Sequence, residues 1–528
     1  MSASGKPRRR TASAVSGAIA AALAVAALPA VTAQAAEAHP RPASTAAAPS
    51  VPSRYADQKL DWRPCEGDPS LECATMTVPR DWHHPDAGPD LTIAVSRHKA
   101  ADPAKRRGVL MMAAGGPGGQ GLLRPGGFAK SSPSVAAVYD VVSFDQRGVG
   151  RSTHATCQTK EEFPAFMAGD YRDRSPAAIQ GVLDRARKLV NDCQERSGGL
   201  LPYLTTEQTA RDMDLYRALL GAPKISYYGA SYATTVGAYY ATLFPRRVER
   251  AVLDSNIDFG SSMERWMTGQ PKSFQRRFDE DFLPWLAKYD SVYHYGRTAA
   301  EAKANWERRR AALHDQPLTV GSAVLDPNMF DAGTSSAIYK ASRGFPALAG
   351  ALAALDHWDT ATPQEKGLVG QLFGQSPDPG FFAEYFSVTC NDTPWNRDLD
   401  RWIARSAKDT VNLPLLGARE LAYASVCAFW PRSGAPEVKV TGAGLPATLM
   451  VNSTHDPATY YEGALRAHRA LRGSRLVTVT GDGDHGQYQN GNACVDATVD
   501  AYLLDGKLPA RDTTCAAKPL PVPAGAAG

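Results

Sequence analysis

Short apolar runs that end in turn residues recur along the first half of the chain. Four of them occupy residues 109–113, 138–144, 225–228 and 251–253, and glycine or polar residues follow each one. Continuous apolar runs of this length are typical of strands that are buried on both faces of a sheet. The pattern therefore predicts four interior β-strands.

Helical patterns lie between these runs, and the clearest covers residues 205–220. Thr205 and Gln208 have the spacing of a capping box, in which both side chains satisfy free backbone N–H groups. Gly221 and Pro223 end the pattern. Alternation of strand and helix predicts an α/β fold with a mostly parallel sheet and helices on both faces.

Residues 261–435 have a different pattern. Ala, Leu, Arg and Trp recur there at helical spacing, whereas strand patterns return only at residues 449–451 and 476–479. We expect a helical lid insertion over 261–435 that interrupts a core formed by residues 55–260 and 436–528.

The N-terminus has the composition of an export signal. Basic residues precede a small-residue apolar run from 14 to about 30, and Ala33-Gln34-Ala35 matches a cleavage site, which predicts a secretory signal peptide over 1–35. A membrane anchor is disfavoured because the run is short, Ala-rich and broken by Pro29. Residues 36–54, rich in Ala, Pro and Ser, predict a disordered leader or pro-segment.

The charge balance changes once the predicted signal peptide is set aside. The chain has 58 Lys and Arg against 54 Asp and Glu, and Lys6, Arg8, Arg9 and Arg10 belong to the predicted signal. Without these four the basic residues number 54, so a mature chain is close to neutral. Charge therefore indicates no nucleic-acid partner and no membrane contact after signal cleavage.

An exported chain with eight cysteines is expected to form disulfides. Zinc binding is disfavoured because the chain has no C-x-x-C or H-x-x-x-H cluster. The sequence alone leaves other connectivities open, but spacing favours neighbouring pairs: Cys65–Cys73, Cys157–Cys193, Cys390–Cys427 and Cys494–Cys515.

The segment Gly229-Ala-Ser-Tyr-Ala233 follows a predicted strand and precedes a helical pattern. This is the context of a nucleophile elbow, a sharp strand-to-helix turn that presents a serine hydroxyl above the sheet. Ser231 is therefore the candidate nucleophile, and the helix N-terminus adds donors for an oxyanion. Ala233 stands where the motif usually has glycine, so the pentapeptide alone leaves a chance turn as the alternative.

A second glycine cluster, Gly115-Gly-Pro-Gly-Gly119, follows the predicted strand 109–113. Glycines allow backbone N–H groups to face a site without an intervening side chain. We expect the backbone N–H groups of Gly116 and Tyr232 to form an oxyanion hole. An ordinary Gly/Pro turn is the alternative, and a phosphate loop is excluded because no Gly-Lys-Ser/Thr follows.

The partners of a nucleophilic serine follow in the second half of the chain. His485 comes directly after the last predicted strand, and Asp456 comes after the strand before it. The order Ser231, Asp456, His485 is that of α/β-hydrolases, which predicts a catalytic triad. Asp482 and Asp484 are rival acids, but they are too close to the histidine along the chain for an easy approach to its ring.

Longer stretches give the chain a family resemblance from about Leu60 to Cys515. It resembles the secreted tripeptidyl aminopeptidases of actinobacteria, within the proline-iminopeptidase group of α/β-hydrolases. The stretches that carry the resemblance are GGPGGQG (115–121), FDQRGVGRS (144–152), TTEQTARDMDLYR (205–217), YYGASYATTVGAYYATLFP (227–245), VERAVLDS (248–255), CAFWP (427–431), STHDPATYY (453–461), GDGDHGQY (481–488) and YLLDGKLP (502–509).

The resemblance implies an α/β-hydrolase fold and a secreted, extracellular serine exopeptidase. Such an enzyme would release tripeptides or short peptides from the free N-termini of peptides and proteins, without metal or cofactor. The insertion would cap the site, and an acid there would hold the substrate ammonium; Asp392 is a candidate, although a loop or helix-cap carboxylate is the more ordinary interpretation. Asp145 and Arg147 are expected to brace the loops below the site.

Two other functions remain open from the sequence. Carboxylesterases and thioesterases of this fold use the same triad, so the substrate is less determined than the reaction. Ala233 and Ser226 depart from the family pattern, where glycine and often asparagine stand, and this bears on substrate range. A binding module built on an inactive hydrolase fold is disfavoured because the three triad residues are all present.

Overall fold

The computed structural model describes residues 51–321, 323–375, 377–431 and 436–526. The predicted signal peptide and residues 36–50 of the predicted leader lie outside the described residues. Helix α1 (Ser53–Ala56) overlaps the end of that leader, because Tyr55 is fully buried and its ring lies 6.0 Å from the ring of Trp82. Folded structure therefore begins slightly before the predicted boundary at residue 55.

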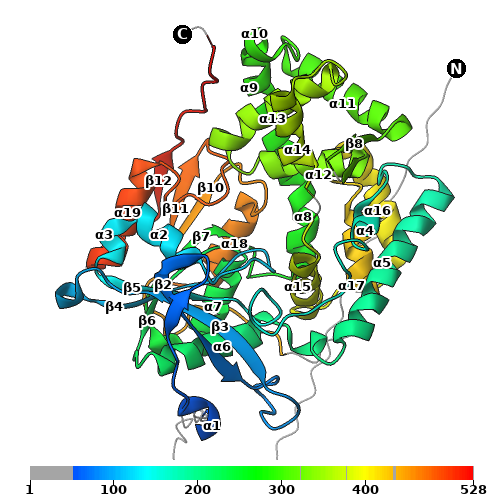
Figure 1. Ribbon diagram of the computed structural model, residues 1–528. Helices are drawn as coiled ribbons and strands as arrows, with labels where there is room; N and C mark the ends of the chain where they lie inside the picture. Colours follow the sequence, from blue (N-terminus) through cyan, green and yellow to red (C-terminus); the bar gives the residue numbers. More distant parts are fainter. Residues whose placement is uncertain (1–50, 322, 376, 432–435, 527–528) are drawn as a thin grey trace, which may run out of the picture. The chain divides into compact units, whose positions relative to one another are not determined.

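A ten-stranded sheet runs through the core, in the order β1-β2-β3-β5-β4-β6-β7-β10-β11-β12 (Figure 1). The first three strands pair antiparallel at one edge, and every pairing from β5 to β12 is parallel, which confirms the predicted sheet. The strands are β1 (Arg63–Cys65), β2 (Asp68–Val78), β3 (Leu91–His98), β4 (Gly108–Met112), β5 (Tyr139–Phe144), β6 (Ile225–Ser231), β7 (Val248–Asn256), β10 (Leu449–Ser453), β11 (Arg475–Thr480) and β12 (Thr513–Ala516).

Alternate residues of the central strands pack into two separate apolar clusters. Val109 and Met111 of β4 belong to one cluster, whereas Leu110 and Met112 belong to the other. Helices α6 (Thr206–Leu219), α7 (Ala233–Leu243) and α18 (Tyr461–Ala470) contribute to the first cluster, and α2 (Arg124–Ser131), α3 (Pro133–Ala136) and α19 (Ala493–Asp505) contribute to the second. The strands are thus buried on both faces, as their continuous apolar runs predicted.

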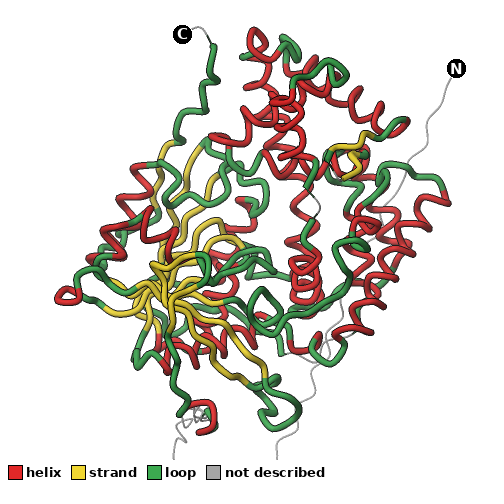
Figure 2. The backbone as a smooth tube through the Cα atoms, viewed as in Figure 1, coloured by secondary structure: helices red, strands yellow, loops and turns green. Residues whose placement is uncertain are grey.

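The chain between β7 and β10 is helical apart from the hairpin β8–β9, as the red segments of Figure 2 show. Much of it packs around its own apolar cluster, which includes Phe278, Trp306 and Phe345. Its elements are α8 (Met263–Arg276), a π-helical turn (Arg277–Phe282), α9 (Leu283–Lys288), α10 (Asp290–Tyr293), α11 (Ala299–Asp315), β8 (Leu318–Val320), β9 (Ala323–Leu325), α12 (Pro327–Ala337), α13 (Ala341–Asp356), α14 (Pro363–Phe373), α15 (Pro379–Asn391), α16 (Leu399–Asn412) and α17 (Glu420–Phe429).

Two helices between β5 and β6 extend this helical region. They are α4 (Pro164–Met167) and α5 (Pro176–Ser197), and α5 packs against α17. Among all the helices in the described ranges, none combines the length and the apolar character that a membrane span requires.

All eight cysteines form disulfides, and the neighbouring pairs that the spacing favoured are confirmed. Cys390–Cys427 joins α15 to α17, and Cys157–Cys193 joins the segment after β5 to α5. The other two pairs are Cys65–Cys73 and Cys494–Cys515.

Loop length predicts how much two of these bridges contribute to stability. Cys157–Cys193 closes a separation of 36 residues and Cys65–Cys73 one of only 8. Since a cross-link restricts the unfolded chain more when its loop is longer, removing the first with a C157A/C193A variant should lower the free energy of unfolding by about 4 kcal/mol, and removing the second by about 2.5 kcal/mol. Urea denaturation measures both, and an equal or reversed order would contradict the loop-entropy argument.

Candidate active site

Ser231 is the last residue of β6, and α7 begins two residues later. Its backbone φ of 62° lies in the left-handed region, which is uncommon for a residue with a side chain. Small neighbours make this turn possible: a Cβ on Gly229 would stand 2.7 Å from the carbonyl oxygen of Ala233. The local geometry is that of a nucleophile elbow.

The glycine loop after β4 approaches Ser231 closely. A Cβ on Gly115 would lie only 3.1 Å from the Cβ of Ser231, so a larger residue would push the loop away. The backbone N–H groups of Gly116 and Tyr232 donate no hydrogen bond to any described residue. Gly116 lines the same cavity as Ser231, and Tyr232 directly precedes α7.

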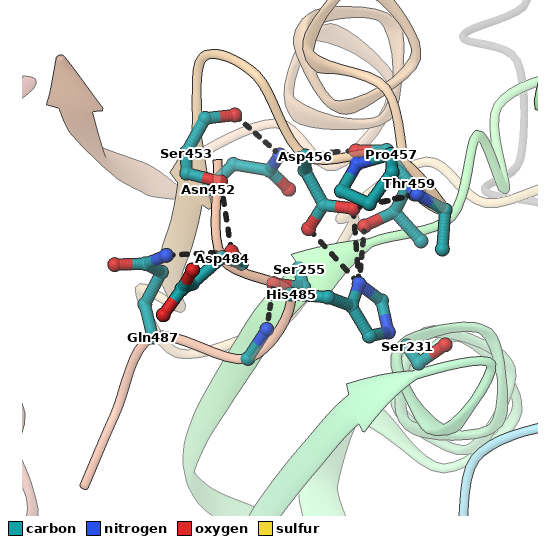
Figure 3. A network of polar contacts seen from close by, with 12 residues as sticks. Ser231, Ser255, Asn452, Ser453, Asp456, Pro457, Thr459, Asp484, His485 and Gln487 are labelled. Carbon is teal, nitrogen blue, oxygen red and sulfur yellow. Dashed lines mark hydrogen bonds and ion pairs between the residues drawn. The ribbon is translucent and has the colours of Figure 1, made fainter. Parts of the chain in front are cut away.

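The imidazole of His485 pairs with Asp456, as Figure 3 shows. Its Nδ1 lies 3.0 Å from both carboxylate oxygens, and Asp456 is fully buried. Two backbone N–H groups, of Ala458 and Thr459, also donate to Asp456 and fix its orientation. The carboxylate thus places the ring proton on Nδ1 and leaves Nε2 as an acceptor.

The other side of the same imidazole ring faces Ser231 (Figure 3). The two side chains line one cavity without a direct hydrogen bond between them. Such contacts often tighten only when substrate is bound. The structure therefore brings Ser231, Asp456 and His485 together in the order and orientation of a relay from carboxylate to imidazole to hydroxyl.

The two rival acids have other partners. Asp484 forms ion pairs with Arg277 at 2.6 Å and Lys518 at 2.9 Å. Asp482 accepts from the backbone N–H of Asp484 and from the side chain of Gln487. Neither carboxylate contacts the ring of His485, and both instead shape the loop that carries it.

The end of β7 anchors the histidine loop. The buried carboxylate of Asp254 accepts the backbone N–H groups of Gln487 and Tyr488, and the hydroxyl of Ser255 accepts the N–H of Gly486 at 2.8 Å. Burial raises the pKa of Asp254, and these N–H bonds oppose that rise. The sequence analysis did not identify these residues, although they lie in the family stretch 248–255.

The lid side also holds His485, through the segment between α12 and α13. The carbonyl of Tyr339 accepts the backbone N–H of His485 at 2.8 Å, and the two rings meet edge to face with centroids 5.2 Å apart. Ala341 donates its N–H to Asp484 in the same loop. No sequence signal indicated this contact, because the two segments are far apart in the chain.

Asp145 and Arg147 brace the loops, as expected. Asp145 accepts the backbone N–H of Gly121, at the end of the glycine loop, at 2.8 Å and that of Arg151, in the loop after β5, at 2.9 Å. Arg147 makes a two-pronged ion pair with Asp212, and both side chains are fully buried. These contacts hold the floor of the site in place.

Asp392 does not line the cavity. Its carboxylate accepts the backbone N–H and the hydroxyl of Thr206, at the start of α6. Burial raises its pKa to about 7, and the Thr206 hydrogen bonds oppose that rise. The structure therefore assigns Asp392 the helix-cap role, and the ammonium-binding role that was considered for it lacks support.

A large cavity of about 1090 Å³ lies over Ser231 and His485. Its lid-side wall includes several aromatic residues, among them Phe381, Phe382 and Tyr385 of α15. The charged residues of the described lining are Arg124, Lys340 and Arg419, all of them cationic. In the ranges that the structure describes, no cluster of His, Cys, Asp or Glu is arranged to hold a metal ion.

Comparison with known proteins places these features in a family. The family model described as TAP-like protein matches residues 414–515. A tripeptidyl aminopeptidase of Streptomyces lividans is 36% identical over 490 residues, which cover 89% of this chain and 89% of the relative. The serine protease Hip1 of Mycobacterium tuberculosis is 28% identical over 87% of this chain and 91% of its own, and a carboxylesterase B of the same organism is 31% identical over 85% and 86%.

The raised pKa of Asp392 predicts a pH-dependent effect of the substitution Asp392→Asn. A carboxyl that titrates near 7 in the folded chain and near its usual value when unfolded loses stabilisation as pH rises from about 4 through 7. Asparagine stays neutral, so the variant should become progressively more stable relative to the parent over that interval. Urea denaturation at each pH measures this difference.

A difference that stays constant from pH 4 to pH 8 would contradict this account of Asp392. The same variant distinguishes the two roles, because a cap residue outside the cavity should leave the KM for a free-amine peptide unchanged.

Proposed function

The chain belongs to the family of the tripeptidyl aminopeptidases, α/β-hydrolases with serine peptidase activity, and from this premise we propose that it releases tripeptides or short peptides from free N-termini by way of Ser231. The observation that carries the proposal is the Asp456–His485 pair, whose free ring edge faces Ser231 inside the cavity. The substrates are peptides or the N-termini of proteins, and neither nucleic acid nor membrane takes part.

The reaction proceeds in two halves. His485 Nε2 takes the proton of Ser231 as Oγ attacks the scissile carbonyl, and Asp456 stabilises the imidazolium that forms. The imidazolium then protonates the amine of the leaving portion, which departs. The N-terminal peptide stays bound to Ser231 as an ester, the acyl-enzyme. Water, activated by the same histidine, hydrolyses this ester and restores the serine.

The tetrahedral intermediates need donors for their negative oxygen. In this proposal the backbone N–H groups of Gly116 and Tyr232 supply them, since both are free of other acceptors and flank Ser231. Phe381 of the lid packs against this loop, because a Cβ on Gly118 would fall on the carbonyl of Phe381. The lid therefore supports the geometry of the donors as well as covering the substrate.

The lid, which we take as residues 261–435 between core parts 55–260 and 436–528, limits how much peptide lies beyond Ser231. A tripeptide in extended form spans about 10 Å, and a cavity of about 1090 Å³ has room for it together with solvent. A cavity that a lid bounds on one side favours removal of short terminal pieces over cleavage within a folded protein.

We also propose that the chain is secreted after cleavage of residues 1–35, with 36–54 as a leader or pro-segment. The four disulfides support this, because such bonds form and persist in oxidising compartments.

A carboxylesterase activity is the second candidate. The observation in its favour is the relative named carboxylesterase B, which matches this chain about as fully as the peptidases do. The proposed triad and oxyanion donors suit an ester as well as an amide, so the substrate test must include both.

The proposed function predicts a specific pattern with a tripeptidyl anilide and its N-acetylated counterpart. The mature protein should cleave the free-amine form and leave the acetylated form intact. Ser231→Ala should lower kcat by about 10⁶ and Asp456→Asn by about 10⁴, because the first removes the nucleophile and the second leaves the histidine in the wrong tautomer. Release of the aniline measures the cleavage of both substrates by the parent protein and the kcat of both variants.

Labelling by a serine-reactive phosphonate provides the control, since it should mark the parent and not Ser231→Ala. Cleavage of simple esters with no cleavage of either anilide would transfer the assignment to the carboxylesterase candidate. Absence of labelling together with absence of cleavage would leave an inactive hydrolase fold.

A further inference from the structure

The charged residues that line the cavity over Ser231 all carry positive charge. Arg124, Lys340 and Arg419 line it, and no Asp or Glu is among its described lining residues. None of these three cations has a carboxylate of the described chain within 4.0 Å, whereas ion pairs such as Arg147–Asp212 and Arg277–Asp484 occur elsewhere in the chain. Asp456, the acid nearest to the reacting groups, is fully buried behind His485.

The fully buried arginines of the chain have their own counter-charges. Arg147, Arg277 and Arg310 are the fully buried arginines of the described residues, and each of them forms an ion pair with at least one carboxylate. Such pairing is expected, because a guanidinium that leaves water needs compensating charge. Arg419 is half-buried and has no such partner.

The guanidinium of Arg419 is nevertheless held in place. It lies over the ring of Tyr423, with its central carbon 4.7 Å from the ring centroid. Its charge also acts on Tyr339, whose pKa is raised to about 12 by burial while Arg419 opposes the rise. Tyr339 contacts His485, so this cation belongs to the same wall as the catalytic histidine.

The other two cations come from the lid and from the core. Lys340 belongs to the lid segment between α12 and α13, and Arg124 belongs to α2 of the core. The Nζ of Lys340 would be 3.8 Å from a Cβ on Gly486, the residue after His485, and burial lowers the pKa of this lysine. Arg124 follows the glycine loop and donates from Nε to the carbonyl of Gln120 at 3.1 Å.

We propose that this cavity selects peptides that carry a carboxylate, and that Arg419 is the residue that binds it. A carboxylate matches the two-pronged donor face of a guanidinium and would supply the charge that the lining lacks. The inference rests on the proposed function, since it names the substrate class of that same site. The free amino terminus of the substrate is also a cation, and the three cations of the lining repel it. A carboxylate on the same substrate would offset this repulsion.

Matched substrates test the proposal. Three pairs of tripeptidyl anilides with free amino termini would carry Glu or its neutral isostere Gln at the first, second or third residue. In at least one pair, kcat/KM for the Glu substrate should exceed that for the Gln substrate by about tenfold or more, the ratio expected for a charge-assisted hydrogen bond. Arg419→Gln should abolish that preference, so that the ratio of kcat/KM between the Glu and Gln substrates falls to about one.

Two further variants separate recognition from a folding defect. Arg419→Lys keeps the charge without the two-pronged geometry and should retain part of the preference. Arg308→Gln removes a cation from the exposed surface of α11 and should leave the preference unchanged.

The carboxylate has two possible sources, and a second arm distinguishes them. Tetrapeptides of alanine as the free acid and as the carboxamide differ only at the leaving end. One result is that the free acid is cleaved faster than the carboxamide, and that this preference is lost in Lys340→Met or Arg124→Gln but kept in Arg419→Gln. This result would assign carboxylate binding to the leaving side and overturn the role of Arg419. If the neutral peptides are cleaved and a carboxylate gives no advantage in either arm, the proposal is overturned and the proposed function stands. If no peptide is cleaved, both are rejected.

Discussion

The active site depends on the buried carboxylate of Asp254 at the end of β7. This strand lies between β6, which carries Ser231, and β10, which precedes Asp456. From that central position Asp254 accepts two backbone N–H groups of the loop after β11 and so fixes the loop that carries His485. Because β6, β7, β10 and β11 are parallel, their carboxyl ends meet at one edge, and a single carboxylate can hold segments more than two hundred residues apart.

The lid contacts the backbone of the segments that carry the proposed catalytic groups, as well as covering the cavity. Tyr339 accepts the backbone N–H of His485, and Phe381 packs against the glycine loop that carries Gly116. Since both contacts involve backbone atoms, the position of the lid and the position of the reacting groups are coupled. Substitutions in the lid can therefore change the rate of the chemical step without touching the substrate.

Buried charge is distributed in two different ways in this protein. In the scaffold, ion pairs such as Arg147–Asp212 are satisfied internally, and breaking such a pair costs about 3–5 kcal/mol. In the cavity, the three cations have no carboxylate partner among the residues that the structure describes, and they face whatever enters it. A binding site that leaves its charges unpaired until a ligand arrives gains selectivity, because only a ligand of opposite charge removes the repulsion.

Local patterns in the sequence determined the strands of the parallel core, the order Ser231, Asp456, His485 and the neighbouring disulfide pairs. Each of these depends on residues that are close in the chain or on a topology that allows few arrangements, so periodicity and spacing were enough. The tertiary structure alone decided that Asp392 caps α6 instead of lining the cavity, that Tyr339 holds His485, and that Arg124, Lys340 and Arg419 converge on one cavity. These outcomes depend on where side chains from distant segments point. The packing of the lid on the core sets those directions, and no local pattern in the sequence encodes them.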